Sequence, residues 1–253
     1  IRHVWIVTDQ QVPPWLDLSS PLVTVVDHRE IFADADALPT FNSHAIESRL
    51  HHIPGLSEHF LYFNDDFFLG RVTTPGQFFH ANGISKFFPS SAKVPGGGRT
   101  PDDEPVVAAG KNNRALVEQV FERHVVDKMK HIPYALRRSV LQELEERFPE
   151  EVGRTTGHRF RHPDDVSIAS SLYQYYSFLT GRAVPSKLAY KYVDLAEPEA
   201  KDEMAAILER RPLDAFCLND TECDESLRDL QLDLVTRFLA GYFPVPSPFE
   251  LPA

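Results

Sequence analysis

Short apolar runs and helix-spaced apolar residues alternate over the first third of the chain. The runs 3–8 and 22–26 are rich in β-branched residues and predict two buried strands. Residues 43–53 carry apolar side chains four apart and lie between two prolines, which predicts a helix. The run 59–63 predicts a third strand, which stops at Asn64-Asp65-Asp66. Strands that alternate with a helix in this way predict an α/β fold with a mainly parallel sheet.

The rest of the chain predicts a helical middle section, followed by further strands and helices. Leucine and valine recur at helical spacing around 116–121 and 136–144, and Pro149 ends the second of these helices. The later elements are expected to be a helix over 164–179, a strand over 187–195, a helix opened by Pro198, a strand over 215–218 and a helix over 225–240. We therefore expect a single α/β catalytic domain over 1–253.

Three segments stand apart from this pattern. Asn82-Gly83 separates two aromatic runs within 77–88, which predicts an edge β-hairpin. Residues 89–110 have a proline and three glycines at their middle and predict a flexible loop or lid. The proline-rich residues 243–253 predict an extended tail. The chain starts at Ile1 directly in a strand pattern, so we expect that it lacks the first strand of its domain.

Composition excludes several classes of protein. Lys and Arg total 26 against 37 Asp and Glu, a net charge of −11 without a basic run, so a nucleic-acid partner is not expected. Only Cys217 and Cys223 are present, which excludes a disulfide framework and fits a reducing compartment. No apolar run approaches the roughly 20 residues that cross a bilayer, so no transmembrane segment is expected. Nothing in the sequence predicts the oligomeric state.

Two strand ends carry candidate metal ligands. Asp65 and Asp66 directly follow the strand 59–63, and adjacent carboxylates at such a position can hold Mg²⁺ or Mn²⁺. Asn and Asp are also common turn formers, so a plain turn is the alternative. Asn219-Asp220 repeats the arrangement after the strand 215–218, where capping of the following helix is the alternative.

Basic and imidazole groups are concentrated in the middle section. Between residues 124 and 162 there are several His, Lys and Arg side chains, and a His and an Arg brought together would suit phosphoryl transfer. Periodicity does not select among them. Ser43 is expected to begin a helix, where its hydroxyl and the free backbone N–H groups could also meet a phosphate.

Several motifs together resemble one known family. They are Leu38–Glu47 (LPTFNSHAIE), Ile53–Ser57 (IPGLS), Phe60–Asp66 (FLYFNDD), His131–Pro133 (HIP), Thr155–His162 (TTGHRFRH) and Cys217–Asp220 (CLND). In this order, and over nearly the whole chain, they resemble the Stealth family of sugar-phosphate transferases. That family includes bacterial capsular polysaccharide phosphotransferases and the precursor of the animal enzyme that transfers GlcNAc 1-phosphate to lysosomal enzymes.

This resemblance implies a reaction and a fold. The reaction is transfer of a hexose 1-phosphate, such as GlcNAc 1-phosphate, from a UDP-sugar to a hydroxyl of an acceptor glycan, with release of UMP, in capsular or cell-wall polysaccharide synthesis. The fold is a Rossmann-like, nucleotide-sugar-binding domain. Carried over motif by motif, the catalytic residues fall on Asp65, His131 and Arg161, and the last motif falls on Asn219.

The site expected from these observations combines a metal ion with a base. We expect Mg²⁺ or Mn²⁺ to bind Asp65 and Asp66, together with Asp220. Either His131 removes the proton of the acceptor hydroxyl, or Asp65 does so while His131 binds a phosphate; both assignments stay open. Arg161 is expected to offset charge on the transferred phosphoryl group. Substrate contacts are expected from Asn42, Ser43, Asn64 and Asn219.

One departure and two alternatives accompany the resemblance. Family members carry an upstream strand ending in a Tyr-Thr-Trp-Val-Asp-Gly type of motif, and this chain does not contain it. The alternatives are a metal-dependent glycosyltransferase, which would release a nucleoside diphosphate, and a non-catalytic polysaccharide-assembly module. We expect a cytoplasmic location, with peripheral attachment to the inner face of the membrane as its variant.

Overall fold

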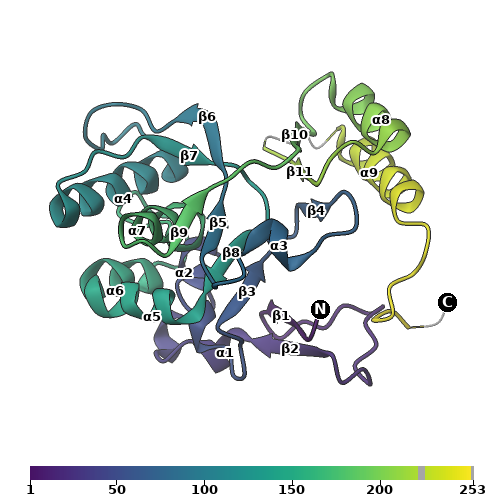
Figure 1. Cartoon of the computed structure of the whole chain (residues 1–253). Helices are drawn as coiled ribbons and strands as arrows, with labels where there is room; N and C mark the ends of the chain where they lie inside the picture. The colour runs from purple at the N-terminus through teal and green to yellow at the C-terminus, as the bar shows by residue number, and fades with distance from the viewer. Residues whose placement is uncertain (222–225, 252–253) are drawn as a thin grey trace.

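The computed structural model of the chain describes residues 1–221 and 226–251 and shows a mixed α/β fold (Figure 1). Its strands are β1 (Val4–Thr8), β2 (Val23–Asp27), β3 (His59–Tyr62), β4 (Phe67–Leu69), β5 (Ser85–Phe87), β6 (Pro89–Lys93), β7 (Asp127–Met129), β8 (Tyr134–Arg137), β9 (Ala183–Pro185), β10 (Tyr190–Asp194) and β11 (Ala215–Asn219). Its α-helices are α1 (His28–Ile31), α2 (Ser43–Glu47), α3 (Pro75–Phe78), α4 (Pro105–Phe121), α5 (Arg138–Arg147), α6 (Pro149–Gly157), α7 (Tyr173–Leu179), α8 (Ala200–Arg210) and α9 (Arg228–Tyr242). The predicted α/β class is confirmed.

The strands form several small sheets. Strands β1 and β2 are parallel, as are β10 and β11 and also β5 and β9. Antiparallel pairs join β4 to β11, β3 to β8 and β6 to β7. The expectation of one mainly parallel sheet is therefore wrong for the described residues. Three of these six pairings are antiparallel, and they link the described strands into sheets of two or three strands.

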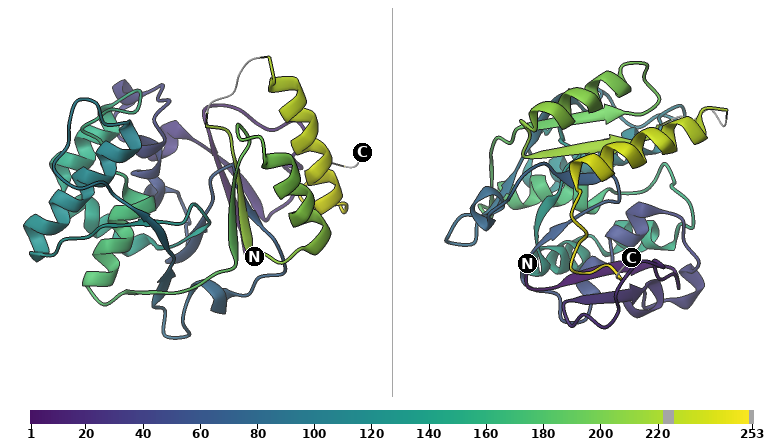
Figure 2. Two further views of the ribbon diagram at one scale, coloured as in Figure 1. Left: turned by 90° about the horizontal axis from the view of Figure 1, so that it is seen from above. Right: turned by 90° about the vertical axis from the view of Figure 1, so that its right-hand side faces the viewer.

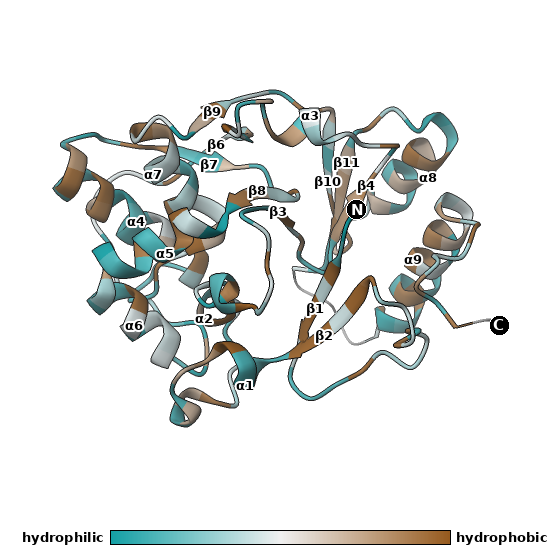
Figure 3. Cartoon of the chain, turned by 60° about the horizontal axis from the view of Figure 1, so that its bottom comes forward, coloured by the Kyte–Doolittle hydropathy of each residue, from teal (hydrophilic) through white to brown (hydrophobic). Residues whose placement is uncertain are grey.

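The elements pack as two unequal groups. Helices α4 to α7 gather on one side, whereas α8 and α9 cover the sheet β10–β11–β4 on the other, as the two views of Figure 2 show. The larger group has its own apolar core, which includes Leu136, Leu144 and Tyr173. The smaller group buries Phe216 of β11 against Phe238 of α9. In Figure 3, which is coloured by hydropathy, strands β1 and β2 are largely apolar and much of α5 is hydrophilic.

The predicted edge hairpin is wrong in its first arm. Thr74 and Gln77 form a capping box and Pro75 opens a helical turn, so α3 takes the place of a strand. The turn itself is present, since the amide of His80 donates to the carbonyl of Ile84 (2.8 Å) and Gly83 adopts a φ of 84°. Beyond that turn, β5 pairs with β9.

A smaller part of the segment 89–110 forms a loop than expected. It begins as β6, which pairs with β7, and α4 starts at Pro105. The buried side chain of Arg114, on α4, donates hydrogen bonds to the carbonyls of Pro95 and Gly97 in the remaining loop. The loop is thereby tied to helix α4.

Helix boundaries also differ from the expected ones. Helix α2 ends at Glu47, and a separate 3-10 turn covers Leu50–His52. The helix expected from residue 164 begins as a π-helical turn, Ile168–Leu172, which continues into α7. The predicted start of the last helix at residue 225 lies outside the described residues, and α9 continues through Gly241.

The segment after α9 lies against the residues between β1 and β2. The amide of Asp17 donates to the carbonyl of Phe249 (2.8 Å), and Leu16 and Glu250 form an antiparallel bridge. The C-terminal segment thus returns to the N-terminal strands (Figure 1). In the described part of the chain, no helix combines the length and the apolar character that a membrane span requires.

Candidate active site

Asp66 and His131 are in contact where the two groups of elements meet. Asp66 lies in the short bend between β3 and β4, and its carbonyl accepts from the amide of Leu218 (3.1 Å), which extends the β4–β11 pairing by one residue. His131 precedes β8, the partner of β3. Its Nε2 lies 3.1 Å from Oδ2 of Asp66. The strand pairing therefore brings together two residues that are far apart in the sequence.

Neighbouring side chains fix this pair. The thiol of Cys217 donates to the same carboxylate oxygen of Asp66 (3.1 Å). The ring of Phe67 meets the imidazole of His131 edge to face, with centroids 4.5 Å apart. The hydroxyl of Tyr190 donates to the carbonyl of His131 (3.0 Å). The imidazole ring is therefore held by Asp66 and Phe67, and the backbone of His131 by Tyr190.

The charges of this pair follow from the same contacts. Burial raises the pKa of the Asp66 carboxyl, but the hydrogen bond and charge of His131 and the hydrogen bond from Cys217 lower it more. The pKa of Asp66 therefore lies below its usual value, and the group is ionised at neutral pH. Burial, together with the adjacent Asp66, raises the pKa of the Cys217 thiol, so Cys217 stays protonated and acts as a donor.

A cavity of about 160 Å³ lies beside His131. Helix α2 contributes Ser43, His44 and Glu47 to its lining, and Asn64 lies at the end of β3. Arg161 comes from the segment between α6 and the π-helical turn. Of the predicted site residues, four line this cavity. They are Ser43, Asn64, His131 and Arg161.

Glu47 is the buried carboxyl of this cavity. Its side chain is only 5% exposed, and its Oε1 accepts a hydrogen bond from the hydroxyl of Tyr62 (3.2 Å). Burial raises the pKa of Glu47 above its usual value, although the charges of His131 and Arg161 act in the opposite direction. Glu47 thus lies within electrostatic reach of both of these predicted catalytic residues.

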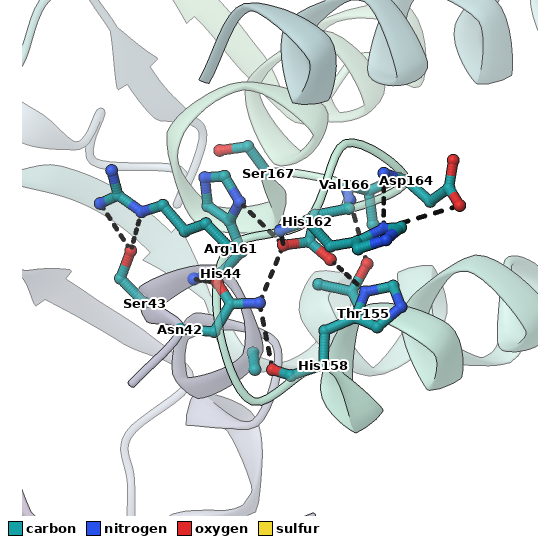
Figure 4. Close-up of polar contacts among 12 residues, drawn as sticks. Asn42, Ser43, His44, Thr155, His158, Arg161, His162, Asp164, Val166 and Ser167 are labelled. Carbon is teal, nitrogen blue, oxygen red and sulfur yellow. Dashed lines mark hydrogen bonds and ion pairs between the residues drawn. The ribbon is translucent and has the colours of Figure 1, made fainter. Parts of the chain in front are cut away.

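Arg161 is held by the first residue of α2. Its guanidinium donates to Oγ of Ser43 from two nitrogens, at 2.9 Å from one terminal nitrogen and 3.3 Å from Nε (Figure 4). The remaining guanidinium N–H groups can meet an anionic ligand in a planar, bidentate manner. Ser43 therefore aims the guanidinium at the cavity that both residues line.

Asp165 supports the part of the site that contains Ser43 and Arg161 through buried hydrogen bonds. Its fully buried carboxylate accepts from Nδ2 of Asn42 (2.8 Å) and from the amide of His162 (2.8 Å), and Nδ1 of His158 lies 2.6 Å away (Figure 4). Asn42 in turn caps α2, because its Oδ1 accepts from the amide of His44. Asn42 is itself completely buried, so it positions α2 rather than meeting solvent in this structure.

The remaining predicted residues lie at the exposed strand ends. Asp65 and Asp220 are both exposed, and Nδ2 of Asn219 donates to the hydroxyl of Tyr192 (2.6 Å). Among the described residues, the group whose ligand atoms could share one metal ion at this point consists of Asp66, His131 and Cys217. Cys223, the other cysteine of the chain, lies outside the described residues.

Part of this arrangement fits a magnesium ion. Oδ1 of Asp66 and Oδ1 of Asn64 are both buried and have no hydrogen-bond partner. They are hard oxygen atoms of the kind that Mg²⁺ prefers, and the exposed carboxylate of Asp65 lies between them in sequence. The nitrogen of His131 and the sulfur of Cys217 suit softer metals. Asp66 and Asn64 therefore offer oxygen ligands that would suit Mg²⁺.

Three family models match the chain. Stealth protein conserved region 2 matches residues 1–87, conserved region 3 matches 130–178, and conserved region 4 matches 205–253. Together these regions cover more than half of the chain. The chain belongs to the Stealth family.

Named relatives within this family are similar over almost all of the chain. The exopolysaccharide phosphotransferase SCO6023 of Streptomyces coelicolor is 57% identical over 250 residues, which are 99% of this chain and 43% of that protein. The exopolysaccharide phosphotransferase CpsY of Mycobacterium tuberculosis (strain ATCC 25618 / H37Rv) is 41% identical over 251 residues, which are 99% of this chain and 47% of that protein. This Stealth chain thus spans less than half the length of these relatives.

The three Stealth regions meet at the candidate active site. Region 2 contributes Glu47 and Asp66, region 3 contributes His131 and Arg161, and region 4 contributes Cys217. Residues that are separated by long intervals in sequence are therefore joined by the fold around one cavity and the adjoining Asp66–His131 pair.

Sequence reasoning missed two residues of this Stealth site. Glu47 was not singled out, although it lies four residues after Ser43, which places both on one face of α2. Cys217 was considered only for disulfide chemistry, although it lies in the motif that ends at Asp220. Helical spacing could have found Glu47, whereas the contact of Cys217 with Asp66 depends on the antiparallel pairing of β4 with β11.

Proposed function

We propose that this chain carries the catalytic site of a sugar-phosphate transferase that acts in exopolysaccharide synthesis. In the proposed reaction, a hexose 1-phosphate moves from a UDP-sugar, such as UDP-GlcNAc, to a hydroxyl of an acceptor glycan, and UMP is released. The names of the relatives support the class of reaction. The nucleotide-sugar-binding role of the fold and a cytoplasmic location belong to the same proposal.

The observation that carries the proposal is the anchoring of His131 by Asp66 next to a cavity that Arg161 also lines. The distance of 3.1 Å between Nε2 of His131 and Oδ2 of Asp66 supports a tautomer in which Nε2 carries the proton and donates it to Asp66. Nδ1 is then the ring nitrogen that can accept a proton from the acceptor hydroxyl. An ionised carboxylate behind an imidazole stabilises the imidazolium that forms.

The steps follow from these positions. The acceptor oxygen attacks the phosphorus that bears the sugar, and its proton moves to Nδ1 of His131. The bond between that phosphorus and the oxygen bridging to the nucleotide breaks, so the leaving group departs as UMP. Arg161 stabilises the negative charge on the transferred phosphoryl oxygens. Lys128, which also lines the cavity, adds a second positive charge near the diphosphate.

The metal contributes to the same electrostatic task. When bound, Mg²⁺ would offset the charge of the diphosphate. Asp66, Asn64 and Asp65 are proposed to hold it, with Asp220 at the neighbouring strand end. Asn219 is proposed to contact the substrates from β11, and Ser43 to do so from the start of α2.

The decisive experiment identifies the nucleotide product. The full-length protein that contains this chain is incubated with UDP-GlcNAc and other UDP-sugars, Mg²⁺ and an oligosaccharide acceptor, and the released nucleotide is separated by chromatography. We expect UMP, dependent on both metal and acceptor. The variant His131→Gln should abolish the release, whereas the control His124→Gln, an exposed histidine outside the cavity lining, should not.

Other products would overturn the proposal in defined ways. Release of UDP would assign the protein to the metal-dependent glycosyltransferases. A protein that releases neither nucleotide from any UDP-sugar, and whose melting temperature does not change with UDP-sugar and Mg²⁺, would be a non-catalytic assembly module.

A further inference from the structure

Three serines, in the π-helical turn and directly before it, line one part of the cavity. We call Ser167, Ser170 and Ser171 the serine wall; all three line the cavity beside His131. Lys128 of β7 is the cation next to this wall in the cavity lining, and Val106 and Val107 of α4 supply apolar surface. This combination of neutral hydroxyls and apolar surface differs from the charged part of the cavity around Glu47 and Arg161.

The backbone explains why adjacent serines line the same cavity. In a regular α-helix, neighbouring residues point about 100° apart, so two consecutive side chains rarely share one ligand. Here the amide of Leu172 bonds to the carbonyl of Ser167 (3.0 Å), five residues earlier, which widens the turn into a π-helix. Such turns are often found at functional sites. Within this turn, Ser170 and Ser171 both reach the cavity.

A buried asparagine fixes the widened turn. Asn113 of α4 is completely buried, and its Nδ2 donates to the carbonyl of Ser167 (2.8 Å) and to Oγ of Ser171 (2.6 Å). Because the hydroxyl of Ser171 accepts from Asn113, its own hydrogen remains available as a donor. The hydroxyls of Ser167 and Ser170 are hydrogen-bonded to each other, so one hydrogen of this pair also remains available.

We propose that the serine wall recognises the hydroxyl groups of the sugar in the donor, and thereby selects which hexose 1-phosphate is transferred. This inference rests on the proposed function, since it assigns the sugar part of the same substrate. A pyranose carries hydroxyls around its edge and apolar C–H groups on its faces, which matches hydroxyl side chains next to valines. Arg161 and Lys128 then remain for the phosphate. Hydroxyl donors held in place in this way favour a sugar that carries the matching hydroxyl over one that lacks it.

The test compares sugar binding with phosphate binding in the full-length protein. Dissociation constants are measured by calorimetry for glucose, galactose, mannose and GlcNAc 1-phosphates, and for inorganic phosphate. In Ser170→Ala, we expect the best hexose 1-phosphate to bind about three- to tenfold more weakly, because one hydrogen bond is lost, while phosphate binding is unchanged. Ser139→Ala, an exposed serine on α5, is the matched control and should change neither constant.

Deoxy sugars identify the contact and keep the test independent of folding. The deoxy analogue that lacks the recognised hydroxyl should bind the wild-type protein about three- to tenfold more weakly, but should bind Ser170→Ala no more weakly than the parent sugar does. Strictly additive losses for every analogue would overturn the proposal. So would an equal loss of inorganic phosphate affinity, which would make the wall a phosphate site, or the absence of binding by all four sugar phosphates.

The outcomes separate this inference from the proposed function. A protein that binds a hexose 1-phosphate through Ser170 but releases UDP keeps the serine wall and loses the phosphotransferase assignment. A protein that releases UMP, with sugar affinity unaffected by Ser170→Ala and by every deoxy analogue, keeps the reaction and loses the serine wall.

Discussion

The hydroxyl of Tyr62 donates a hydrogen bond to Oε1 of Glu47 (3.2 Å) and so ties helix α2 to the strand that leads into Asn64. Both side chains are shielded from solvent, and burial raises the pKa of Glu47. A carboxyl with a higher pKa in the folded than in the unfolded chain favours folding only while it is protonated. Ionised Glu47 therefore costs stability at neutral pH.

Replacement of Glu47 by glutamine should remove this cost. We expect Glu47→Gln to have a higher free energy of unfolding than the wild type at pH 7, and the gain should vanish as the pH falls below about 4, where an unfolded glutamate is protonated. Urea denaturation at both pH values measures it. Glu146→Gln, at an exposed position of α5, should show no such pH dependence. A lower stability of Glu47→Gln at pH 7 would contradict the argument.

The tautomer of His131 should depend on Asp66 and not on Asp65. In Asp66→Asn, the amide can donate to Nε2 and so displace the proton to Nδ1, which removes the base. We expect kcat to fall by about 10²- to 10⁴-fold with little change in melting temperature. Nitrogen chemical shifts of the His131 ring should report the change of tautomer.

Asp65→Asn provides the comparison for Asp66. Because Nε2 of His131 contacts Asp66, Asp65→Asn should leave the ring shifts unchanged even where it lowers activity through the metal. Since the pKa of Asp66 lies below its usual value, protonation of Asp66 should not reduce kcat above about pH 4. Altered ring shifts in Asp65→Asn alone would reverse the two assignments.

The sequence was sufficient to predict elements whose signals are local. The β-branched runs at β1 and β2 and the apolar spacing in α4 correspond to observed elements, whereas the pattern over 136–144 is divided between β8 and α5. The first arm of the edge hairpin was wrong because the capping residues Thr74 and Gln77 outweighed the aromatic pattern. The single sheet was wrong because strand pairing depends on contacts between distant segments, such as β3 with β8.

The same limit applies to the candidate site. Motifs identified His131 and Arg161, and the fold places both on one cavity. They did not identify which carboxylate of Asp65-Asp66 contacts His131, because adjacent residues point in different directions after a strand and the choice depends on the β4–β11 pairing. The buried Asn113 and the π-helical turn carried no recognisable pattern at all.

Arg161 should act through its planar guanidinium and not only through its charge. We expect Arg161→Lys to raise KM for the donor and to lower kcat, since an ammonium group cannot bind a phosphoryl group and Ser43 with the same fork. A loss of about 10- to 1000-fold in kcat/KM corresponds to about 1.4–4 kcal/mol of transition-state stabilisation.

Ser43→Ala is the control for this positioning. It removes the hydroxyl that Arg161 contacts at 2.9 Å but keeps the guanidinium. We expect a smaller loss than for Arg161→Lys, because the guanidinium and its charge remain and only the hydroxyl that orients it is removed. Full activity in Arg161→Lys, measured as UMP release, would show that a positive charge alone is sufficient at this position.

Asp165 should be essential for the stability of the region around α2. Burial raises the pKa of its carboxyl, but the side chain of His44, the amide of His162 and His158 lower it more, so the pKa lies below its usual value. A carboxylate with a depressed pKa contributes stability above the pKa of the unfolded chain, and that contribution is lost as the pH falls towards the folded pKa. At pH 7 the contribution is complete.

Asp165→Ala and Asp164→Ala distinguish a buried network from a surface ion pair. Asp165→Ala leaves Asn42 and the histidines without their buried acceptor, and we expect a loss of about 3–5 kcal/mol at pH 7 by urea denaturation. Asp164 pairs with Arg99 (2.7 Å) at the surface, so its replacement should cost at most about 1 kcal/mol. Near pH 3, the difference between the wild type and Asp165→Ala should shrink, because the wild-type carboxyl begins to be protonated. Equal losses in the two variants at pH 7 would show that the buried contacts of Asp165 do not hold α2 in place.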